Sequence, residues 1–493
     1  MSAQLLPLLL PAAIFVLVGV VVALLGLLQY RLAGRVSAQG RVAAALLIIG
    51  FGALLSIALT TRSLNYSHLG EGKVILYEDY ASGFAASRWL SLFLLGAAMI
   101  EIFRGGVRAH AAVKPDPARP LLAALLSFYI GSLLVQGFLS EHVGFSHKEL
   151  YVPILLLAAY CQPVRDLRLV LGAAKLAVAA LLLGSLIGIA VRPDFVLHRP
   201  EPGVIPGIDW RLFGLTAHAN TLGPVALLGM LLELYSPCRR RWMLWLNLGS
   251  GVAVFVLAQS RTAWVAGLLI LLVVWVPLSI RPGRTSGGDP HGFSRAVWTL
   301  IGCMVLLIAV VGGMAAFGGT EYLQRKTDLG TLNGRFQIWD ITLQAWRDNV
   351  LFGYGPEIWG AERRVRFNMF HVGQAHNQFV QTLGEAGLVG LVLLIVYLLA
   401  LLCAAWRRFV ESRGLVLALL VLLLARSVTE APMRSEGLLS WSTFLHVLLL
   451  LVACHYMRQP AAHVAFEAPS PLERVRGARD CKSGPHRFAA SWS

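Results

Sequence analysis

The chain has 493 residues, of which 57% are hydrophobic and only 14% are charged. A soluble protein carries about 25% charged residues, so this composition excludes an ordinary soluble globular protein. The formal net charge of +16 is compatible with nucleic-acid binding, but the Arg and Lys residues stand in short connections between apolar runs. That placement indicates a multi-pass membrane protein with a basic cytoplasmic rim and no nucleic-acid partner.

Many apolar runs reach or approach the roughly 20 residues that a helix needs to cross a bilayer. We therefore predict an all-α, polytopic membrane helix bundle of about 12–13 transmembrane helices. The predicted spans are Leu5–Leu28, Val42–Thr61, Trp89–Phe103, Pro120–Leu139, Tyr151–Pro163, Leu169–Val191, Leu212–Tyr235, Trp242–Ala258, Ala263–Ile280, Ala296–Phe317, Leu388–Trp406, Leu415–Ala425 and Leu438–Tyr456. The first run is long and has no basic residue before it, which is typical of a spanning helix rather than a cleaved signal peptide.

Arg residues follow every odd-numbered span through the eleventh, whereas the even-numbered connections are less regularly basic. The positive-inside rule then places the N-terminus outside and the C-terminal tail in the cytoplasm. The even-numbered connections are external, and one of them, residues 318–387, is much the longest. The six cysteines follow neither a disulfide nor a zinc-binding pattern, so we expect no metal site and no cofactor.

These features divide the chain into five segments. They are N-terminal transmembrane helices (1–210), central transmembrane helices with Arg211 and Arg261 at the outer face (211–317), a long external loop (318–387), C-terminal transmembrane helices (388–458) and a cytoplasmic tail (459–493). The tail is rich in Pro, Ser, Ala and Arg, a composition typical of disorder.

The long loop contains an amphipathic pattern, because Phe336, Trp339, Leu343 and Trp346 recur at helical spacing while Arg335 takes another face. We predict a helix here with its Phe and Trp side chains on the apolar side. Two placements stay open, one in the membrane interface and one against the outer face of the bundle.

Two further features follow in the loop. The first is a basic cluster of Arg363, Arg364 and Arg366, which we interpret as solvated or in contact with lipid headgroups. The second is the pair His376 and Asn377, which stands where the loop re-enters the membrane.

Other polar residues share this outer side. Arg211 stands at the mouth of the seventh predicted span, and His218 and Asn220 are predicted about two turns inside it. Polar groups inside a membrane are expensive and usually face the protein interior. Arg261 lies in a very short external turn, where a single Arg is most often an interfacial anchor. Several such groups on one face make a functional site the better interpretation.

Guanidinium groups bind phosphate oxygens in a bidentate manner. Fixed cations would therefore stabilise a diphosphate leaving group, on which negative charge develops in the transition state. A histidine can accept a proton from an attacking hydroxyl at neutral pH. No carboxylate cluster with metal-ligand spacing stands out on this side. The set therefore predicts metal-independent displacement of a phosphate leaving group by a hydroxyl.

Four segments resemble the O-antigen ligase and bacterial polysaccharide polymerase family of integral membrane glycosyltransferases. They are RLFGLTAHANTLGP at Arg211–Pro224, QSRTAWVAG at Gln259–Gly267, GRFQIWDITLQAWRDNVLFGYG at Gly334–Gly355, and HNQFVQTLGEAGLVGL at His376–Leu391. They occur in the order typical of the family. Thirteen spans is one more than the family would lead us to expect, and many relatives have Pro or Lys where this chain has Ala219.

The resemblance implies an inverting transferase that takes a glycan from undecaprenyl diphosphate on the periplasmic face of the bacterial inner membrane. The acceptor is either another lipid-linked repeat unit, for a polymerase of O-antigen or exopolysaccharide, or lipid A-core, for a ligase. The NVLFGYG and HAN elements resemble polymerases more, so polymerase is our prediction and ligase the alternative. Membrane lipids and other polysaccharide assembly proteins are the further partners that it implies.

For individual residues, the resemblance implies Arg211 and Arg261 on the diphosphate and His376 as the base or acceptor-orienting group. Arg335 is a second-tier candidate for binding the diphosphate or another part of the substrate. Further candidates for the same role are His218, Asn220 and Asn377. Two other classes are less favoured. A transporter of the lipid-linked sugar would need charges along a membrane path, for which Lys175 is the clearest candidate, and we find no internal repeat. A structural partner in polysaccharide export would tolerate loss of Arg261 and His376.

Overall fold

A computed structural model describes residues 36–58, 85–110, 116–198, 205, 208–275, 330–369, 372–434 and 437–460. The chain forms two units, Met1–Arg458 and Gln459–Ser493, and every helix described below belongs to the first. Two predicted spans, Leu5–Leu28 and Ala296–Phe317, and nearly all of the predicted tail lie outside the described residues.

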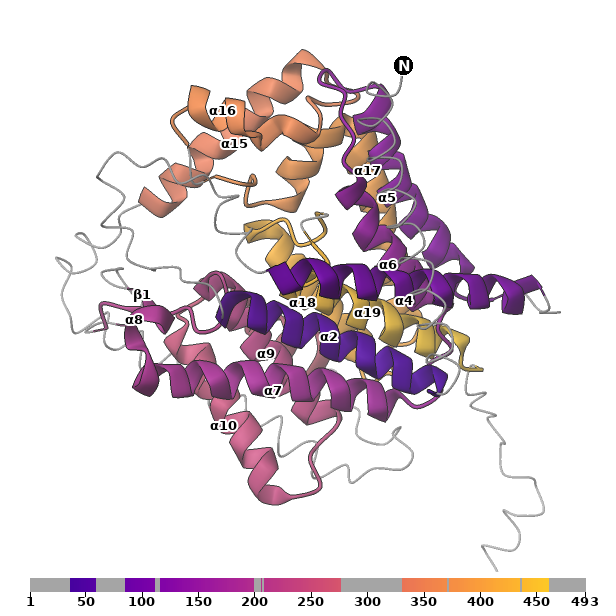
Figure 1. Ribbon diagram of the computed structural model, residues 1–493, viewed down its shortest axis with the longest axis vertical. Helices are drawn as coiled ribbons and strands as arrows, with labels where there is room; N and C mark the ends of the chain where they lie inside the picture. Colours follow the sequence, from indigo (N-terminus) through magenta and orange to yellow (C-terminus); the bar gives the residue numbers. More distant parts are fainter. Residues whose placement is uncertain are drawn as a thin grey trace, which may run out of the picture. The chain divides into compact units, whose positions relative to one another are not determined.

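Helices make up nearly all of the described secondary structure (Figure 1). The longer ones are α2 (Ala38–Ala58), α4 (Ala85–His110), α5 (Arg119–Phe138), α6 (Tyr151–Cys161), α7 (Leu167–Val191), α9 (Ala219–Tyr235), α10 (Arg241–Leu257), α11 (Arg261–Ile270), α15 (Gly330–Asp348), α17 (Gln378–Arg407), α18 (Leu415–Thr429) and α19 (Trp441–Arg458). The short elements are η2 (His147–Leu150), α8 (Pro193–Val196), β1 (Leu197–His198), β2 (Arg211–Leu212), the π-helical turn η3 (Leu271–Trp275), η5 (Pro356–Trp359) and α16 (Ala361–Arg366).

Six described helices are long and apolar enough to cross a membrane, namely α2, α4, α5, α7, α17 and α19. Shorter apolar helices accompany them, among them α9, α10, α11 and α18. The prediction of an all-α polytopic membrane protein is thereby confirmed. Within the bundle α17 packs along α5, α2 along α7, and α9 against α10 (Figure 1). Their apolar side chains form one large buried core.

A second, smaller core lies in the loop that precedes α17. It is built from Ile338, Ile341, Ala345, Ile358, Trp359, Met369, Val372 and Ala375. Helix α15 packs on α17, so of the two predicted placements the structure shows the one against the bundle. The predicted apolar face is partly wrong, because α15 buries Ile338, Ile341 and Thr342 while Phe336 is 54% exposed. Small residues where α15 meets α17 allow the two helices to approach closely. A Cβ added at Gly384 of α17 would lie 2.6 Å from Thr342 Cγ2 of α15.

Helix α17 is interrupted at Gly387, whose φ of +62° lies in the left-handed region that favours glycine. The preceding loop satisfies the backbone groups that the break exposes. Leu388 N donates to Val350 O (3.0 Å), and Tyr354 N donates to Gly384 O (2.8 Å). The break separates a polar outer half of α17 from an apolar half that begins at Leu388, where the sequence predicted the span to begin.

The seventh predicted span begins later than expected. Arg211 and Leu212 do not enter the helix, because they form β2 and pair antiparallel with β1. Gly214, with φ of +56°, then turns the chain, and α9 starts only at Ala219. His218 is the N-cap of α9, so the prediction that it lies two turns inside a span is wrong.

Candidate functional site

The ends of four helices meet on one side of the bundle. Asn377, the N-cap of α17, donates from Nδ2 to Val428 O near the end of α18 (3.1 Å). Thr262, in the first turn of α11, donates from Oγ1 to Thr429 Oγ1 (3.1 Å). The start of α9 approaches α11 so closely that a Cβ on Gly223 would lie 2.6 Å from Ser260 Cβ. The N-terminal ends of α9, α11 and α17 therefore gather around the C-terminal end of α18.

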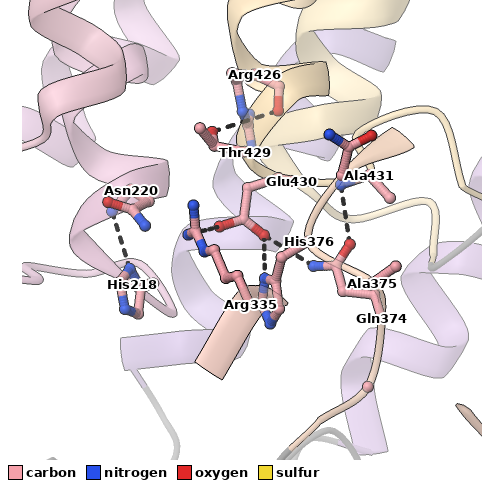
Figure 2. Close-up of polar contacts among 12 residues, drawn as sticks. His218, Asn220, Arg335, Gln374, Ala375, His376, Arg426, Thr429, Glu430 and Ala431 are labelled. Atoms are coloured by element: carbon pink, nitrogen blue, oxygen red, sulfur yellow. Dashed lines mark hydrogen bonds and ion pairs between the residues drawn. The ribbon is translucent and has the colours of Figure 1, made fainter. Parts of the chain in front are cut away.

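Glu430 lies at the centre of this arrangement, directly after α18 (Figure 2). Its Oε2 accepts a hydrogen bond from Gln374 Nε2 (3.0 Å) and lies 2.9 Å from His376 Nδ1. Its Oε1 lies 3.8 Å from Arg335 Nη2. Gln374 also accepts from Ala431 N through Oε1 (3.0 Å), so one amide holds both the carboxylate and the backbone beside it.

The charge state of Glu430 follows from these neighbours. Burial alone would raise the pKa of its carboxyl, but the hydrogen bond and charge of His376 outweigh burial, with further help from His218 and Arg335. The pKa of Glu430 is therefore below its ordinary value, and the group is a carboxylate at neutral pH. Because a carboxylate only accepts, His376 Nδ1 carries the hydrogen, and in neutral His376 the lone pair is on Nε2.

The backbone of His376 has φ of +50°, an uncommon conformation for a residue other than glycine. Its neighbours hold it there. Ala375 N donates to Gln381 Oε1 (2.5 Å), and Ala375 O accepts from Trp339 Nε1 (2.8 Å). On the other side Asn377 caps α17. Such strained positions cluster at functional sites, where the surrounding structure fixes them.

Arg211 and His218 lie on the α9 side of the site. Arg211 donates from Nη2 to Asn220 Oδ1 (3.1 Å) and from Nε to Ala258 O (3.3 Å). The backbone N–H of Asn220 donates to His218 Nδ1 (3.0 Å), which leaves Nε2 as the protonated nitrogen of a neutral His218 ring (Figure 2). The ring also packs against Phe213, with centroids 4.7 Å apart. These contacts fix a guanidinium and an imidazole at the start of α9.

Arg261 is the first residue of α11, and Ser260 caps that helix by accepting from Ala263 N. Gln259 before it has φ of +48° and bonds both Ile205 N and Trp210 O (2.9 Å each). This turn places the Arg261 side chain at the surface. The part of the chain that the structure describes holds no partner for its guanidinium, so its charge is available to an anionic ligand.

Comparison with known protein families gives a match to this part of the chain. Residues 221–395 match the family model described as O-antigen ligase. Over these residues the chain is similar to the O-antigen ligase family. The resemblance drawn from the sequence is thereby confirmed. No curated protein matches the chain.

The O-antigen ligase match contains Arg261, Arg335 and His376, while Arg211 and His218 precede it. Of the residues that the sequence singled out, the structure gathers His376, Arg335 and His218 around Glu430 and joins Asn220 to Arg211. Asn377 has a structural role, because its side-chain Nδ2 donates to Val428 O and its Oδ1 accepts from Phe379 N.

One residue of the predicted basic cluster has a contact of its own, and one residue of the site was not predicted from the sequence. Arg363 of the basic cluster stacks over the Tyr354 ring (4.3 Å to the centroid). Glu430 was not singled out from the sequence, although it stands in a predicted external connection. Its one available signal was an acidic residue directly after a short apolar run, on the side where His376 and Arg261 were expected.

Proposed function

We propose that this protein transfers a glycan from undecaprenyl diphosphate to a sugar hydroxyl on the periplasmic face of the bacterial inner membrane, by an inverting, metal-independent displacement. The observation that carries the proposal is the His376–Glu430 pair, which lies among Arg and His side chains at a meeting point of helix ends. The match of residues 221–395 to the O-antigen ligase family model supports it.

In this mechanism His376 is the general base. The acceptor hydroxyl gives its proton to Nε2, and its oxygen attacks the anomeric carbon of the donor sugar as the bond to the diphosphate oxygen breaks. The carboxylate of Glu430 orients the ring through Nδ1 and stabilises the imidazolium that forms. Attack from the face opposite the leaving group inverts the anomeric centre.

Arg211 and Arg261 would bind the diphosphate. Arg261 is the first residue of α11, and Arg211 contacts Asn220 in the first turn of α9. At both helix starts backbone N–H groups add partial positive charge. The negative charge of the leaving group increases as the glycosidic bond breaks, so these fixed cations stabilise the transition state more than the bound donor. Arg335 is closer to Glu430, and we assign it to the acceptor side of the site.

The proposed acceptor is a second lipid-linked repeat unit, following the resemblance of NVLFGYG and HAN to polymerases. A ligase that uses lipid A-core is the second candidate, because the matching family model is described as O-antigen ligase. Both use the same donor and the same base. They differ in the glycan that occupies the acceptor side.

The test is a gene-deletion strain of the source bacterium, complemented with wild type or with His376→Ala, and its surface polysaccharide resolved on a gel. A polymerase predicts that the deletion leaves one repeat unit on the core or abolishes free exopolysaccharide. If the protein is a ligase, the deletion strain should keep its polymer linked to the lipid carrier, and its lipid A-core should carry no polymer. His376→Ala should reproduce the deletion at normal protein levels. Full complementation by His376→Ala would contradict the proposal.

A further inference from the structure

A buried histidine lies inside the membrane bundle, away from the exposed groups of the site. His446 of α19 is 1% exposed. Its Nε2 lies 2.7 Å from the hydroxyl of Tyr397 on α17, and its Nδ1 lies 3.3 Å from the hydroxyl of Tyr129 on α5. An imidazole buried among apolar helices is costly unless both nitrogens are bonded, and here both are.

The direction of each hydrogen bond can be assigned. The Tyr129 hydroxyl donates its only hydrogen to Met433 O (3.1 Å), because a carbonyl can only accept. It must then accept from His446, so His446 Nδ1 carries the hydrogen. His446 Nε2 is therefore the acceptor for the Tyr397 hydroxyl. The result is a directed chain of three bonds, from Tyr397 through His446 and Tyr129 to the Met433 carbonyl.

Met433 belongs to the connection that carries Glu430. Its N–H donates to Gln378 Oε1 (2.8 Å), so the two polar groups of this backbone residue are held from α17 and from α5. Two residues earlier in the same connection Gln374 holds Ala431 N, and it also holds the Glu430 carboxylate. The first part of the connection is thus fixed at Ala431 and at Met433, and the second of these contacts depends on Tyr129.

We infer that Tyr129, His446 and Tyr397 are positioning residues of the transferase, which hold the Glu430 connection so that its carboxylate meets His376 Nδ1. This inference rests on the proposed function of that pair. All three side chains are buried within the bundle. They act by fixing the backbone from which Glu430 projects, and a shift of a few tenths of an ångström there would lengthen the bond to His376.

The first test is Tyr129→Phe in the purified full-length protein, reconstituted with radiolabelled undecaprenyl-diphosphate-linked repeat units taken from the deletion strain. We expect kcat to fall about tenfold with KM for the donor unchanged. The matched control is Tyr235→Phe, which removes a hydroxyl that also donates to a backbone carbonyl, that of Arg413 (2.7 Å), away from this connection. Tyr397→Phe, two hydrogen bonds further from Met433, should lower kcat less than Tyr129→Phe.

The second test is a double-mutant cycle with Glu430→Gln. If Tyr129 acts through Glu430, the loss caused by Tyr129→Phe should largely vanish in the Glu430→Gln background. A full tenfold loss in that background, an unchanged kcat in Tyr129→Phe alone, or an equal loss in Tyr235→Phe would each overturn the positioning role. Full transfer by Glu430→Gln itself would instead contradict the proposed function, so the two failures are distinguishable.

Discussion

Two carboxylates in this protein, each paired with a nitrogen base, have opposite surroundings. Lys175 Nζ lies 3.2 Å from Glu233 Oε2, with side chains 12% and 0% exposed. Glu233 also accepts from Cys238 N (2.6 Å) and from Asn247 Nδ2 (2.9 Å). In the second pair Glu430 is 14% exposed, whereas its partner His376 is 31% exposed. The first pair is closed on both sides, whereas the second joins a largely buried carboxylate to a more accessible histidine.

This difference separates a structural charge from a functional one. A closed ion pair satisfies its own charges and leaves nothing for a ligand. At the second pair His376 Nε2 remains for a proton, and the nearby Arg261 has no partner in the described part of the chain. Lys175 was the residue that favoured a transporter, and its pairing with Glu233 removes that motivation.

The largest expected effect is that of His376→Ala, which removes the base and should lower the transfer rate about 10²–10⁴-fold. Reconstituted protein with labelled donor would measure it. His147→Ala is the control, because His147 is a more exposed histidine that lies in η2 and contacts Tyr151. A comparable loss in both variants would show that the effect is not specific to the site.

Arg261→Ala should lower transfer about 100-fold, since it removes one fixed cation from the diphosphate. Arg261→Lys should restore only part of this loss, because an ammonium cannot bind phosphate oxygens in the bidentate manner of guanidinium. Arg366→Ala, in the basic cluster of α16, tests whether the loss of any exposed Arg would give the same result. Activity of Arg366→Ala should stay near that of wild type. Wild-type activity in Arg261→Ala would contradict the assignment to the diphosphate.

Breaking the closed pair should affect stability rather than chemistry. Lys175→Met leaves the Glu233 carboxylate buried without its cation and should cost about 3–5 kcal/mol. The double variant Lys175→Met, Glu233→Leu should recover much of that loss. Thermal unfolding in detergent gives the stability, and transfer per folded molecule should equal that of wild type in each case. Reduced transfer per folded molecule would revive a role for Lys175 on a transport path.

The smallest expected effect is a pH-dependent difference in stability between wild type and Glu430→Gln. The pKa of Glu430 is lowered in the folded protein, so its stabilising contribution is fully present above the ordinary pKa of 4.5. The contribution is lost as the pH falls through the lower, folded pKa. The difference in Tm should therefore stay constant from about pH 7 to 4.5 and shrink below that. Glu141→Gln, at an exposed carboxyl, serves as the control. A difference that vanishes above about pH 5 would contradict the lowered pKa.

Hydrophobic run lengths predicted the bundle well, because crossing a membrane imposes a local requirement on composition. They also placed the start of a span at Leu388, where Gly387 interrupts α17. The predicted depth of His218 within the span was wrong. The position of His218 depends on the pairing of β1 with β2, and hydropathy contains no information about that pairing.

The site was predicted in part. Arg211, Arg261 and His376 carried a signal in their charge or rarity and in their shared external side. Glu430 did not, since its meeting with His376 depends on how the end of α18 packs on the start of α17, 54 positions away. His446 is a single polar residue in an apolar run, and its partner Tyr129 comes from 317 positions away. Such contacts are set by tertiary packing.

The most direct test of the central claim follows the two halves of the donor separately. Undecaprenyl-diphosphate-linked repeat units carrying ³H in the sugar and ³²P in the diphosphate would be given to vesicles containing the purified wild-type protein, with His376→Ala as the comparison. The account predicts that ³H passes to longer glycan or to lipid A-core while ³²P stays on the lipid, and that His376→Ala abolishes the separation. Movement of both labels together across the vesicle membrane, with the bond between them intact, would contradict it.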